Sequence, residues 1–484
     1  MKKKVGVMLT AGAVACTLLA SVGLAGCGGA SISEFVMPEN GYDGSKVTIT
    51  FATKNGQSLA NVVEKAIPRF NKLYPNITVE IDNNIKDWDE LADNIGTKIT
   101  SGKQPNIAYC YSDHVASYNQ AGACVALDEF FLPGKGYDHI MVTDATGHTE
   151  PLVLTQAQVD DYIDAFWEDG WVYKDEHMYT LPLAKSTEVL FYNVDAFKEF
   201  GIVDEEGNAK VPTTWAEMEE VCKTIKEKDT SDQCIALGYD SSANLFITRC
   251  QQKGLPYTST DYTNHYQFNT QEHKDIVKTL KEWNDKGYLT TQGVIGEYSS
   301  NFFTVTDRTK RHCYMSIGST GGAAYQLAEK VDGKSAFEVG VAPIPQEDPS
   351  NPKTILQGPN VCIFKKQNPQ EVIASWLLVK FLTTEEEFQG NYSQVSGYSP
   401  VTESVFNGKV YKAFREKGTV MAQVAEVCYS YAKNNAFFTS PAFIGSSVAR
   451  EQVENIVNSV LKAGKNIDTM FNQAIQECSR YKDI

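Results

Sequence analysis

The stretch Leu181–Phe191 constrains the fold of this 484-residue chain more than any other. Both ends of the stretch are apolar and suited to a β-strand, but its centre, Lys185–Glu188, is polar. A strand buried in the middle of one core would not normally carry four polar residues in a row. We therefore interpret the stretch as a crossover between two α/β lobes, with its polar centre facing a cleft between them.

Length and charge narrow the possibilities further. A single hydrophobic core stops growing beyond about 250–300 residues, so the length of this chain predicts two lobes. The hydrophobic content of 42% is ordinary for a soluble globular protein, and the formal net charge is −16. An acidic chain of this kind is poorly suited to bind nucleic acids or anionic lipid surfaces.

The first 26 residues have the pattern of a signal peptide. Three lysines, Lys2–Lys4, precede the apolar run Val5–Ala20, and small residues lead to Cys27. This ending resembles the lipobox of bacterial lipoproteins, in which cleavage precedes the cysteine and its sulfur is acylated. We expect a lipid anchor at Cys27 on the extracellular face of the cell membrane, followed by a flexible tether over residues 27–45. The alternative is an unlipidated signal peptide that ends near a cysteine.

Strand and helix patterns alternate after the tether. Strand, helix, strand, helix, strand is the order of a parallel sheet with right-handed crossovers. In open sheets of this kind, ligands bind beyond the carboxyl ends of the strands. The predicted strands are 47–51, 77–81 and 107–111, and the predicted helices are 58–73 and 87–99.

Two later helices carry start signals. Thr155 is placed to cap a helix over 156–166, and Thr214 with Glu217 has the spacing of a capping box. Residues 132–178 as a whole are less regular, and we expect them to form an insertion on the first lobe.

Several motifs in this chain resemble one protein family. Tyr179-x-Leu-Pro182 is followed by Tyr192-Asn-x-Asp-x-Phe197 and by Pro212-x-Thr-Trp-x-Glu217, and Ser101-Gly-x-x-Pro-Asn-Ile107 precedes them. The pattern is similar to that of the extracellular solute-binding proteins of ABC importers, the group that includes maltose-binding protein. The resemblance implies a lipid-anchored, monomeric, non-enzymatic receptor that delivers a small solute to a membrane permease and its ATPase. A sugar or oligosaccharide is the first expectation for the ligand.

The resemblance also implies a fold class and a division of the chain. The expected fold is a two-lobed, type II periplasmic-binding-protein-like α/β fold, in which each lobe is a mixed, mainly parallel sheet flanked by helices. Three hinge crossings join the lobes, and the second and third are expected at 337–345 and 396–400. The N-terminal lobe would comprise 46–186 plus 341–396, and the C-terminal lobe 187–340 plus 397–484.

Candidate ligand contacts in the first half follow from the predicted topology. Side chains just beyond the first and third strands, and in the centre of the crossover, should face the cleft. Each has a structural alternative, because Asn-Gly pairs form turns, aspartates cap helices and crossover residues can hydrogen-bond a neighbouring crossing. These candidates are Asn55, Gln57, Tyr111, Ser112, Asp113, Lys185, Ser186 and Thr187.

The resemblance implies further contacts in the second half, at Asn244, Ser319, Thr320, Gln357, Gly358 and Phe443. Asn244 is equally suited to cap a helix, and Phe443 to pack in the core. Sugar-binding family members often carry a tryptophan after the Gly-Ser pair at 318–319. Here Thr320 and Gly321 follow that pair, which weakens the case for sugar stacking at this position.

The sequence carries no common catalytic motif. The sequence lacks the common nucleophile, zinc-protease, dinucleotide and phosphate-loop patterns, and its seven histidines lack metal-ligand spacing, so we expect no metal or cofactor. Besides Cys16 and Cys27, nine cysteines remain without a Cys-x-x-Cys pair, and we expect buried free thiols.

Two other classes of protein stay open. A glycoside hydrolase needs only two carboxylates, which can lie far apart in sequence. A cell-surface carbohydrate-active enzyme with Asp113 and Glu188 as acid and base is therefore the alternative to a receptor. A surface adhesin is a third class, and it predicts no concave small-molecule site.

Overall fold

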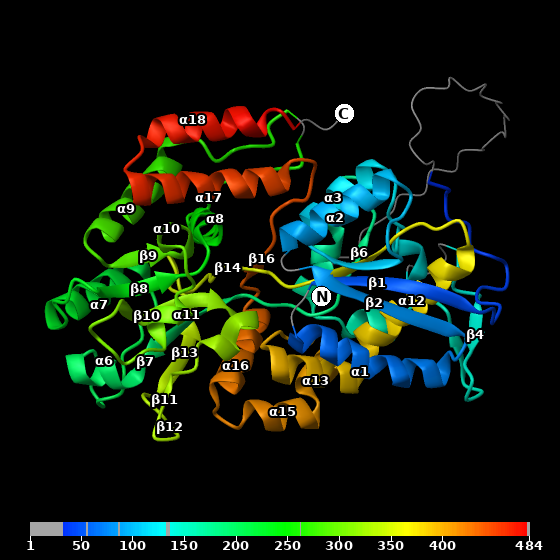
Figure 1. The fold of residues 1–484 in the computed structure, drawn as a ribbon, viewed down its shortest axis with the longest axis horizontal. Coiled ribbons are helices and arrows are strands. Elements are labelled where there is room, and N and C mark those ends of the chain that lie inside the picture. Colours follow the sequence, from blue (N-terminus) through cyan, green and yellow to red (C-terminus); the bar gives the residue numbers. More distant parts are fainter. Residues whose placement is uncertain (1–31, 55–56, 86–87, 132–135, 262, 482–484) are drawn as a thin grey trace.

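The computed structural model describes residues 32–481, apart from 55–56, 86–87, 132–135 and 262. Two α/β bodies lie side by side along the long axis of the molecule, each built on a five-stranded sheet (Figure 1). None of the helices described is long and apolar enough to cross a bilayer. The predicted signal peptide, Cys27 and Asn55 lie outside the described residues.

The first sheet has the strand order β2-β1-β3-β15-β6. Strand β1 pairs in parallel with β2 and β3, whereas β15 pairs antiparallel with β3 and β6. The apolar helix α12 packs against β1, β15 and β6, which buries this side of the sheet. The strands are β1 (Val47–Lys54), β2 (Ile77–Ile85), β3 (Ile107–Cys110), β6 (Thr180–Pro182) and β15 (Asn360–Ile363), and the main helices α1 (Gln57–Leu73), α2 (Trp88–Thr100), α3 (Ser112–Gln120), α12 (Pro369–Thr384) and α13 (Glu386–Ser396).

The second sheet has the strand order β13-β7-β10-β8-β9. Strand β8 is parallel to β9 and β10, and β7 is antiparallel to β10 and β13. Both sheets are therefore mixed, as expected. We also expected parallel pairings to predominate, but in each sheet parallel and antiparallel pairings are equally frequent. The strands are β7 (Glu188–Asn193), β8 (Cys234–Tyr239), β9 (Leu289–Thr291), β10 (His312–Ser319) and β13 (Val339–Pro343), and the main helices α6 (Val194–Phe200), α7 (Trp215–Lys228), α8 (Ser242–Gln252), α9 (Gln271–Asp285), α17 (Ser446–Ala463) and α18 (Ile467–Cys478).

Smaller elements complete the two bodies. The insertion of the first body carries β4 with β5 and two short helices, and the helices α15 and α16 lie in the lower middle of the view (Figure 1). These elements are β4 (Met141–Thr143), β5 (Thr149–Pro151), α4 (Gln156–Asp161), α5 (Asp164–Glu168), α10 (Gln292–Ile295), α11 (Ser300–Phe303), β11 (Lys330–Val331), β12 (Lys334–Ser335), β14 (Thr354–Ile355), α14 (Glu403–Asn407), α15 (Lys409–Arg415), α16 (Val420–Lys433) and β16 (Phe437–Phe438).

Each sheet has its own hydrophobic core. Phe51, Tyr109 and Trp376 belong to the first core, whereas Phe246 and Met315 belong to the second. A smaller cluster packs α16 against β7 and β13. Two cores in one chain confirm the two-lobed fold class that length and motifs predicted.

The stretch Leu181–Phe191 does pass from one sheet to the other. Its first part lies in β6 of the first sheet and its last part in β7 of the second, with Leu183–Thr187 between them. The crossover interpretation of this stretch is confirmed.

The second and third crossings lie beside the first. Lys185 forms an antiparallel bridge with Ser399 on one side, and Ser186 forms one with Gln357 on the other. The expected second crossing at 337–345 includes β13, which pairs with β7 in the second sheet, so the chain returns to the first sheet between β13 and β15. After the third crossing, the chain stays with the first core through Val401 and the hydrophobic residues of α14 and α15 before it reaches α17.

Candidate functional site

A hydrogen-bonded network of polar side chains begins where the first crossing enters the second sheet. Glu188, the first residue of β7, is 1% exposed, and its carboxylate accepts hydrogen bonds from Tyr239 Oη at 2.5 Å and Asn244 Nδ2 at 2.8 Å. The guanidinium of Arg450 donates a hydrogen bond to the side-chain oxygen of Asn244. This hydrogen-bonded network therefore connects β7, β8, α8 and α17 on the side of the second body that faces the first.

Burial dominates the electrostatics of Glu188. Removal from water raises the pKa of its carboxyl group to about 7, although the hydrogen bonds from Tyr239 and Asn244 and the charge of Arg450 oppose the rise. A carboxyl group with this pKa is poised between its two protonation states near neutral pH.

The first body contributes aromatic rings to the same place. Tyr111 directly precedes α3, and its ring centroid lies 4.8 Å from that of Trp88. Burial raises the pKa of the Tyr111 phenol, nearby Tyr398 adds to the rise, and the guanidinium of Arg450 opposes it. The helices α3 and α17 are in contact. Arg450 of the second body therefore lies within electrostatic reach of the first body.

Tyr257 completes the surroundings of Arg450. Burial raises the pKa of its phenol, the charge of Arg450 opposes the rise and that of Asp113 adds to it. The hydroxyl group has no hydrogen-bond partner within the described part of the chain. The side-chain oxygen of Gln357, in the second crossing, is likewise buried without a partner among those residues. Two unsatisfied polar atoms at the junction are groups that a bound solute could satisfy.

The third crossing adds Tyr398 to the junction. A Cβ atom at Gly321 would lie 2.7 Å from the ring of Tyr398, so only glycine leaves room for the tyrosine there. The sequence departure at Thr320 and Gly321 thus has a steric reason: the tyrosine of the third crossing occupies the space beside them.

The predicted contacts in the crossover are all hydrogen-bonded to neighbouring segments of the protein. The ammonium group of Lys185 is buried and donates to Asp169 Oδ2 at 2.7 Å and to Asn360 Oδ1 at 2.8 Å. The hydroxyl of Thr187 lies 2.8 Å from the carbonyl oxygen of Ile355, and Ser186 exchanges backbone hydrogen bonds with Gln357. The alternative reading, in which these residues hydrogen-bond neighbouring segments, describes what the structure shows.

Gly358 is required by this packing. Its φ is +97°, and a Cβ there would lie 2.4 Å from the carbonyl oxygen of Ala184 and 2.8 Å from Cα of Lys185. Gly358 therefore lies against the backbone of the first crossing, and the structure gives it that role whether or not a ligand is bound.

Several other predicted contacts form local structure. Ser112 donates to the carbonyl oxygen of Asp169 at 3.2 Å. Ser319 precedes a 3₁₀ turn and accepts from the backbone N–H of Gly321 at 3.2 Å, and the buried Thr320 donates its backbone N–H to Thr187. Asp113 lies in the first turn of α3 and remains partly exposed on the side of Tyr111.

Phe443 and the residues after the first strand complete the set. Phe443 is 5% exposed and stacks on His265 with ring centroids 4.4 Å apart and an interplanar angle of 5°, which fits the core alternative. Gln57 begins α1, but its side chain, like the whole of Asn55, lies outside what is described. Of the fourteen predicted contacts, the structure brings Tyr111, Asp113 and Asn244 to the surroundings of Arg450, and it places Gln357 beside Ser186 in the crossings between the bodies.

Sequence reasoning missed four residues at the junction, Trp88, Tyr257, Tyr398 and Arg450. Arg450 carries no local signal, because it is 206 positions from Asn244 and the two meet only when α17 packs on α8. Trp88 and Tyr398 lie in segments that the sequence did single out, a helix start and the third crossing. Their aromatic side chains next to predicted cleft loops were a usable signal.

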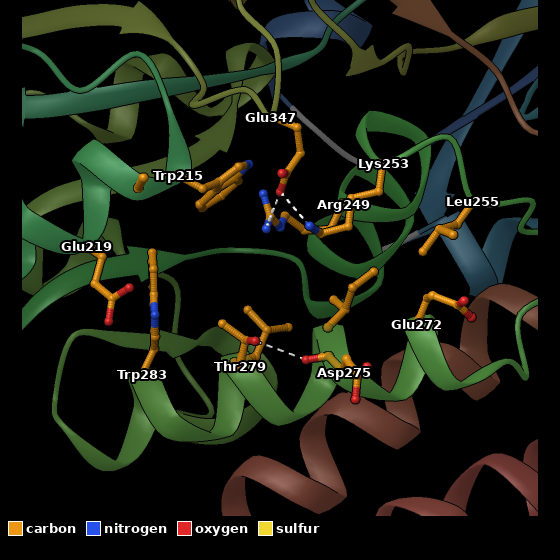
Figure 2. Close-up of a pocket in the computed structure, with 13 residues that line it drawn as sticks. Trp215, Glu219, Arg249, Lys253, Leu255, Glu272, Asp275, Thr279, Trp283 and Glu347 are labelled. Atoms are coloured by element: carbon orange, nitrogen blue, oxygen red, sulfur yellow. Dashed lines mark hydrogen bonds and ion pairs between the residues drawn. The ribbon is translucent and has the colours of Figure 1, made fainter.

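A pocket of about 720 Å³ lies elsewhere, on the second body between α7, α8 and α9. Figure 2 shows Glu347, from the second crossing, reaching the cationic groups of Arg249 and Lys253 at 2.5 and 3.2 Å. Trp215, on the same wall, is 6% exposed and donates from Nε1 to Gln252. None of the fourteen predicted contacts lines this pocket.

The structure also gathers possible metal ligands away from the junction. Asp229, Cys234 and His312 offer three donor atoms that all lie within 4.8 Å of one another. All nine cysteines in the described residues are buried and free, as expected from their spacing.

Two sheets joined by three adjacent crossings define a two-lobed binding-protein fold, and solved structures of that kind match it. UgpB from Mycobacterium tuberculosis in complex with glycerophosphocholine has a TM-score of 0.70 at 18% identity, covering 90% of this chain and 98% of that one. The sugar-binding protein MalE from Xanthomonas citri has a TM-score of 0.68 at 17% identity, covering 90% and 97%. At these identities the similarity establishes the fold.

The sequence itself establishes the family. Residues 65–418 match the bacterial extracellular solute-binding proteins, and this chain belongs to that family. Similar characterised relatives include the sn-glycerol-3-phosphate-binding periplasmic protein UgpB of Shigella flexneri, 25% identical, and that of Escherichia coli K12, 24% identical. Each match extends over 275 residues, 55% of this chain and 58% of the relative, so it spans little more than half of the relatives' length.

Proposed function

We propose that this protein is the extracellular receptor of an ABC importer, which binds a small solute between its two lobes and delivers it to a permease. The observation that carries the proposal is the convergence on one junction of Tyr111 from the first body, Arg450 from the second body and Tyr398 from the third crossing. A solute that contacts both bodies would stabilise the arrangement in which they lie close together, and so shift the population toward it.

The ligand class follows from the chemistry of the junction. Aromatic rings such as Trp88 and Tyr111 suit the C–H faces of a sugar, and the unsatisfied polar atoms of Tyr257 and Gln357 suit its hydroxyl groups. A carbohydrate is therefore our first candidate.

A phosphate-bearing polyol is the second candidate, and one observation favours it. Arg450 places a guanidinium group at the junction. One of its nitrogens donates a hydrogen bond to Asn244 on the neighbouring helix α8. Guanidinium groups bind phosphate oxygens through paired, charge-assisted hydrogen bonds. The UgpB relatives are named for sn-glycerol-3-phosphate, which carries a phosphate group.

The enzymatic alternative gains little support from the geometry. Glu188, one of its two proposed carboxylates, is 1% exposed and already accepts hydrogen bonds from Tyr239 and Asn244. A catalytic acid or base has to reach the proton that it transfers. We propose that Glu188 positions Asn244, and through it Arg450, and that the protein releases its ligand unchanged.

The proposal includes lipid anchoring at Cys27 and action as a monomer with a permease and its ATPase. The sequence before Cys27 supports the anchor, since it combines a basic start, an apolar run and small residues before the cysteine. Metabolic labelling with a radioactive fatty acid tests it: wild-type protein should incorporate label, and Cys27→Ala should not.

A thermal-shift screen of the purified protein tests the receptor proposal. The panel should contain mono- and oligosaccharides, glycerol phosphates and glycerophosphodiesters. A true ligand present at 100 times its Kd should stabilise the protein by about 2.7 kcal/mol. Recovery of the bound compound unchanged, at one per chain, supports a receptor. Conversion of the compound would support the enzyme, and no response to any solute would contradict both.

A further inference from the structure

A second site, far from the junction, lies at the amino ends of β8 and β10. Cys234 and His312 are register partners on these parallel strands, so their side chains emerge next to each other on one face of the sheet. Asp229 ends α7, five residues before β8 begins. Glu188 contacts Tyr239 at the other end of β8, so the two sites lie at opposite ends of one strand.

The hydrogen bonds of His312 show which of its ring nitrogens could bind a cation. Nδ1 lies 2.8 Å from the carbonyl oxygen of Lys310, which only accepts hydrogen bonds, so Nδ1 must carry a hydrogen. Nε2 lies 2.7 Å from Asp229 Oδ2, which is also an acceptor. With its hydrogen on Nδ1, the ring has a lone pair at Nε2 that faces the carboxylate of Asp229. Nε2 and Oδ2 are therefore two neighbouring donor atoms that one metal ion could bind.

We propose that Asp229, Cys234 and His312 bind a Zn²⁺ ion. Imidazole nitrogen, thiolate sulfur and carboxylate oxygen are the donors that zinc takes in proteins, and three protein ligands leave a fourth position for water. Magnesium and calcium prefer all-oxygen surroundings, which Cys234 and His312 do not provide. The three donor atoms lie within 4.8 Å of one another, so side-chain adjustments of about an ångström would bring all of them to the bond lengths of one zinc ion.

The surroundings resemble the outer contacts of known metal sites. The backbone carbonyl of Lys310 fixes the ring tautomer of His312, and Tyr314 Oη donates to Asp229 Oδ2 at 2.7 Å. Metal-binding histidines commonly donate their second nitrogen in this way, and metal-binding carboxylates are commonly hydrogen-bonded. The side chains of Asp229 and His312 are 10% and 3% exposed, so both donor groups are largely buried.

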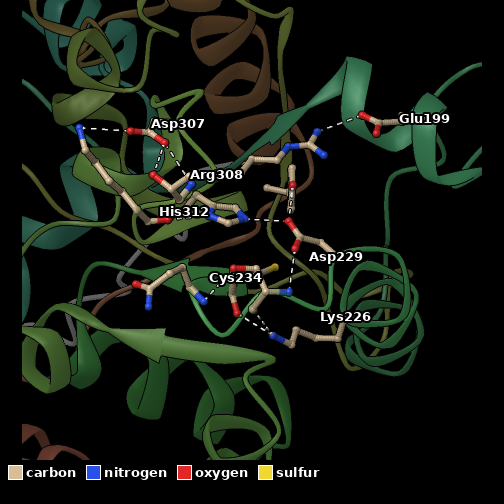
Figure 3. Close-up of polar contacts among 12 residues, drawn as sticks. Glu199, Lys226, Asp229, Cys234, Asp307, Arg308 and His312 are labelled. Carbon is tan, nitrogen blue, oxygen red and sulfur yellow. Dashed lines mark hydrogen bonds and ion pairs between the residues drawn. The ribbon is translucent and has the colours of Figure 1, made fainter.

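Neighbouring cations do not occupy the position between the donors (Figure 3). Lys226 donates to the carbonyl oxygen of Cys234 at 2.7 Å, and Arg308 pairs with Glu199 at 3.0 Å. Zinc bonds of about 2.0–2.1 Å to nitrogen and oxygen set these ligands roughly 3.3 Å apart in a tetrahedron. Zinc binding would thus move Nε2 and Oδ2, now 2.7 Å from each other, apart by about 0.6 Å. The bound ion would link the end of α7 to two strands of the second sheet.

Cobalt spectroscopy on the purified protein is the test. A titration with Co²⁺, which replaces zinc, should produce a thiolate-to-cobalt charge-transfer band that saturates at one equivalent. Cys234→Ser should abolish the band, whereas Cys222→Ser, which changes another buried thiol of the same body, should leave it intact. Tyr314→Phe should weaken the affinity about 10–100-fold.

Zinc itself gives a second readout that does not depend on the variants' colour. Zn²⁺ should raise the Tm of the wild-type protein by several degrees, EDTA should reverse the rise, and Cys234→Ser should lose it. The absence of a thiolate band from the wild-type protein would overturn the proposal and leave only the hydrogen-bond contact between His312 and Asp229. A band or a Tm rise that survives in Cys234→Ser would also overturn it, because the ion would then be bound elsewhere.

Discussion

Lys185 and Ser399 exchange two backbone hydrogen bonds, from Lys185 N to Ser399 O at 3.2 Å and from Ser399 N to Lys185 O at 2.6 Å. On its other side the first crossing exchanges hydrogen bonds with Gln357 through Ser186. The first crossing therefore lies between the second and the third. Any rotation of one lobe against the other has to bend all three segments together, which confines the hinge to this short, hydrogen-bonded region.

Gly358→Ala should weaken the hinge. The substitution places a Cβ against the backbone of Ala184 and Lys185 in a left-handed conformation, and strain plus overlap should lower the free energy of unfolding by about 2–4 kcal/mol. Gly207→Ala is the matched control, because Gly207 has φ of +82° but no atom within 4 Å of its Cβ position, so only about 1 kcal/mol should be lost. Urea denaturation measures both; equal losses would show that the close approach has no energetic weight.

Lys185→Met should destabilise the protein strongly. Loss of the ammonium group leaves the buried carboxylate of Asp169 without its cation, which should reduce the free energy of unfolding by about 3–5 kcal/mol. Adding Asp169→Asn should restore part of the loss. Lys286→Met, which removes an exposed partner of Glu219, should change stability by at most about 1 kcal/mol. A double variant no more stable than Lys185→Met would contradict the explanation by an unpaired charge.

Glu188 should make stability depend on pH. Its pKa is about 7 in the folded protein against an ordinary value of 4.5, so between these values the folded state keeps a proton that the unfolded state has released. The free energy of unfolding should therefore fall as pH rises through this window, by on the order of 3 kcal/mol in total. Glu188→Gln should remove this component. Denaturation curves of both proteins from about pH 5 to about pH 8 measure it. Parallel pH profiles would show that Glu188 does not titrate in this range.

Arg450→Met should reduce affinity for an anionic ligand more than for a neutral one. A hydrogen bond to a charged group contributes about 1.5–3 kcal/mol, so the Kd of a phosphate-bearing ligand should rise roughly 10–150-fold. Arg480→Met removes an exposed arginine that pairs with Glu477, and it should leave the Kd unchanged. Isothermal titration calorimetry gives these values. An unchanged Kd in Arg450→Met would show that the ligand does not bind at the junction near α17.

Local sequence signals predicted much of the fold. The strands at 47–51, 77–81 and 107–111 form as β1, β2 and β3, and the capping box of Thr214 and Glu217 starts α7. The helix expected over 156–166 instead splits into α4 and α5, because Tyr162 and Ile163 adopt extended backbone angles and Tyr162 bridges to Thr402. That interruption depends on a partner 240 residues later, which no local pattern contains.

The site was harder to predict for the same reason. Polar residues in the crossover were correctly placed between the lobes, but their partners decide their roles, and Asp169 and Asn360 hold Lys185 inside the first body. Arg450 and the Asp229, Cys234 and His312 group arise only from packing between distant segments. Cys234 and His312 become neighbours through the pairing of β8 with β10.

The central claim is that a solute holds the two bodies together. Pulsed electron–electron double resonance, which measures the distance between two spin labels, tests this claim most directly. Ser117 on α3 and Asn455 on α17 are exposed and lie on opposite bodies, and the native cysteines of the described chain are buried, so Ser117→Cys and Asn455→Cys can be spin-labelled selectively. Addition of the solute identified by the thermal screen should shorten and narrow the distance distribution between the labels. A distribution that stays the same at saturating solute would contradict closure around a ligand.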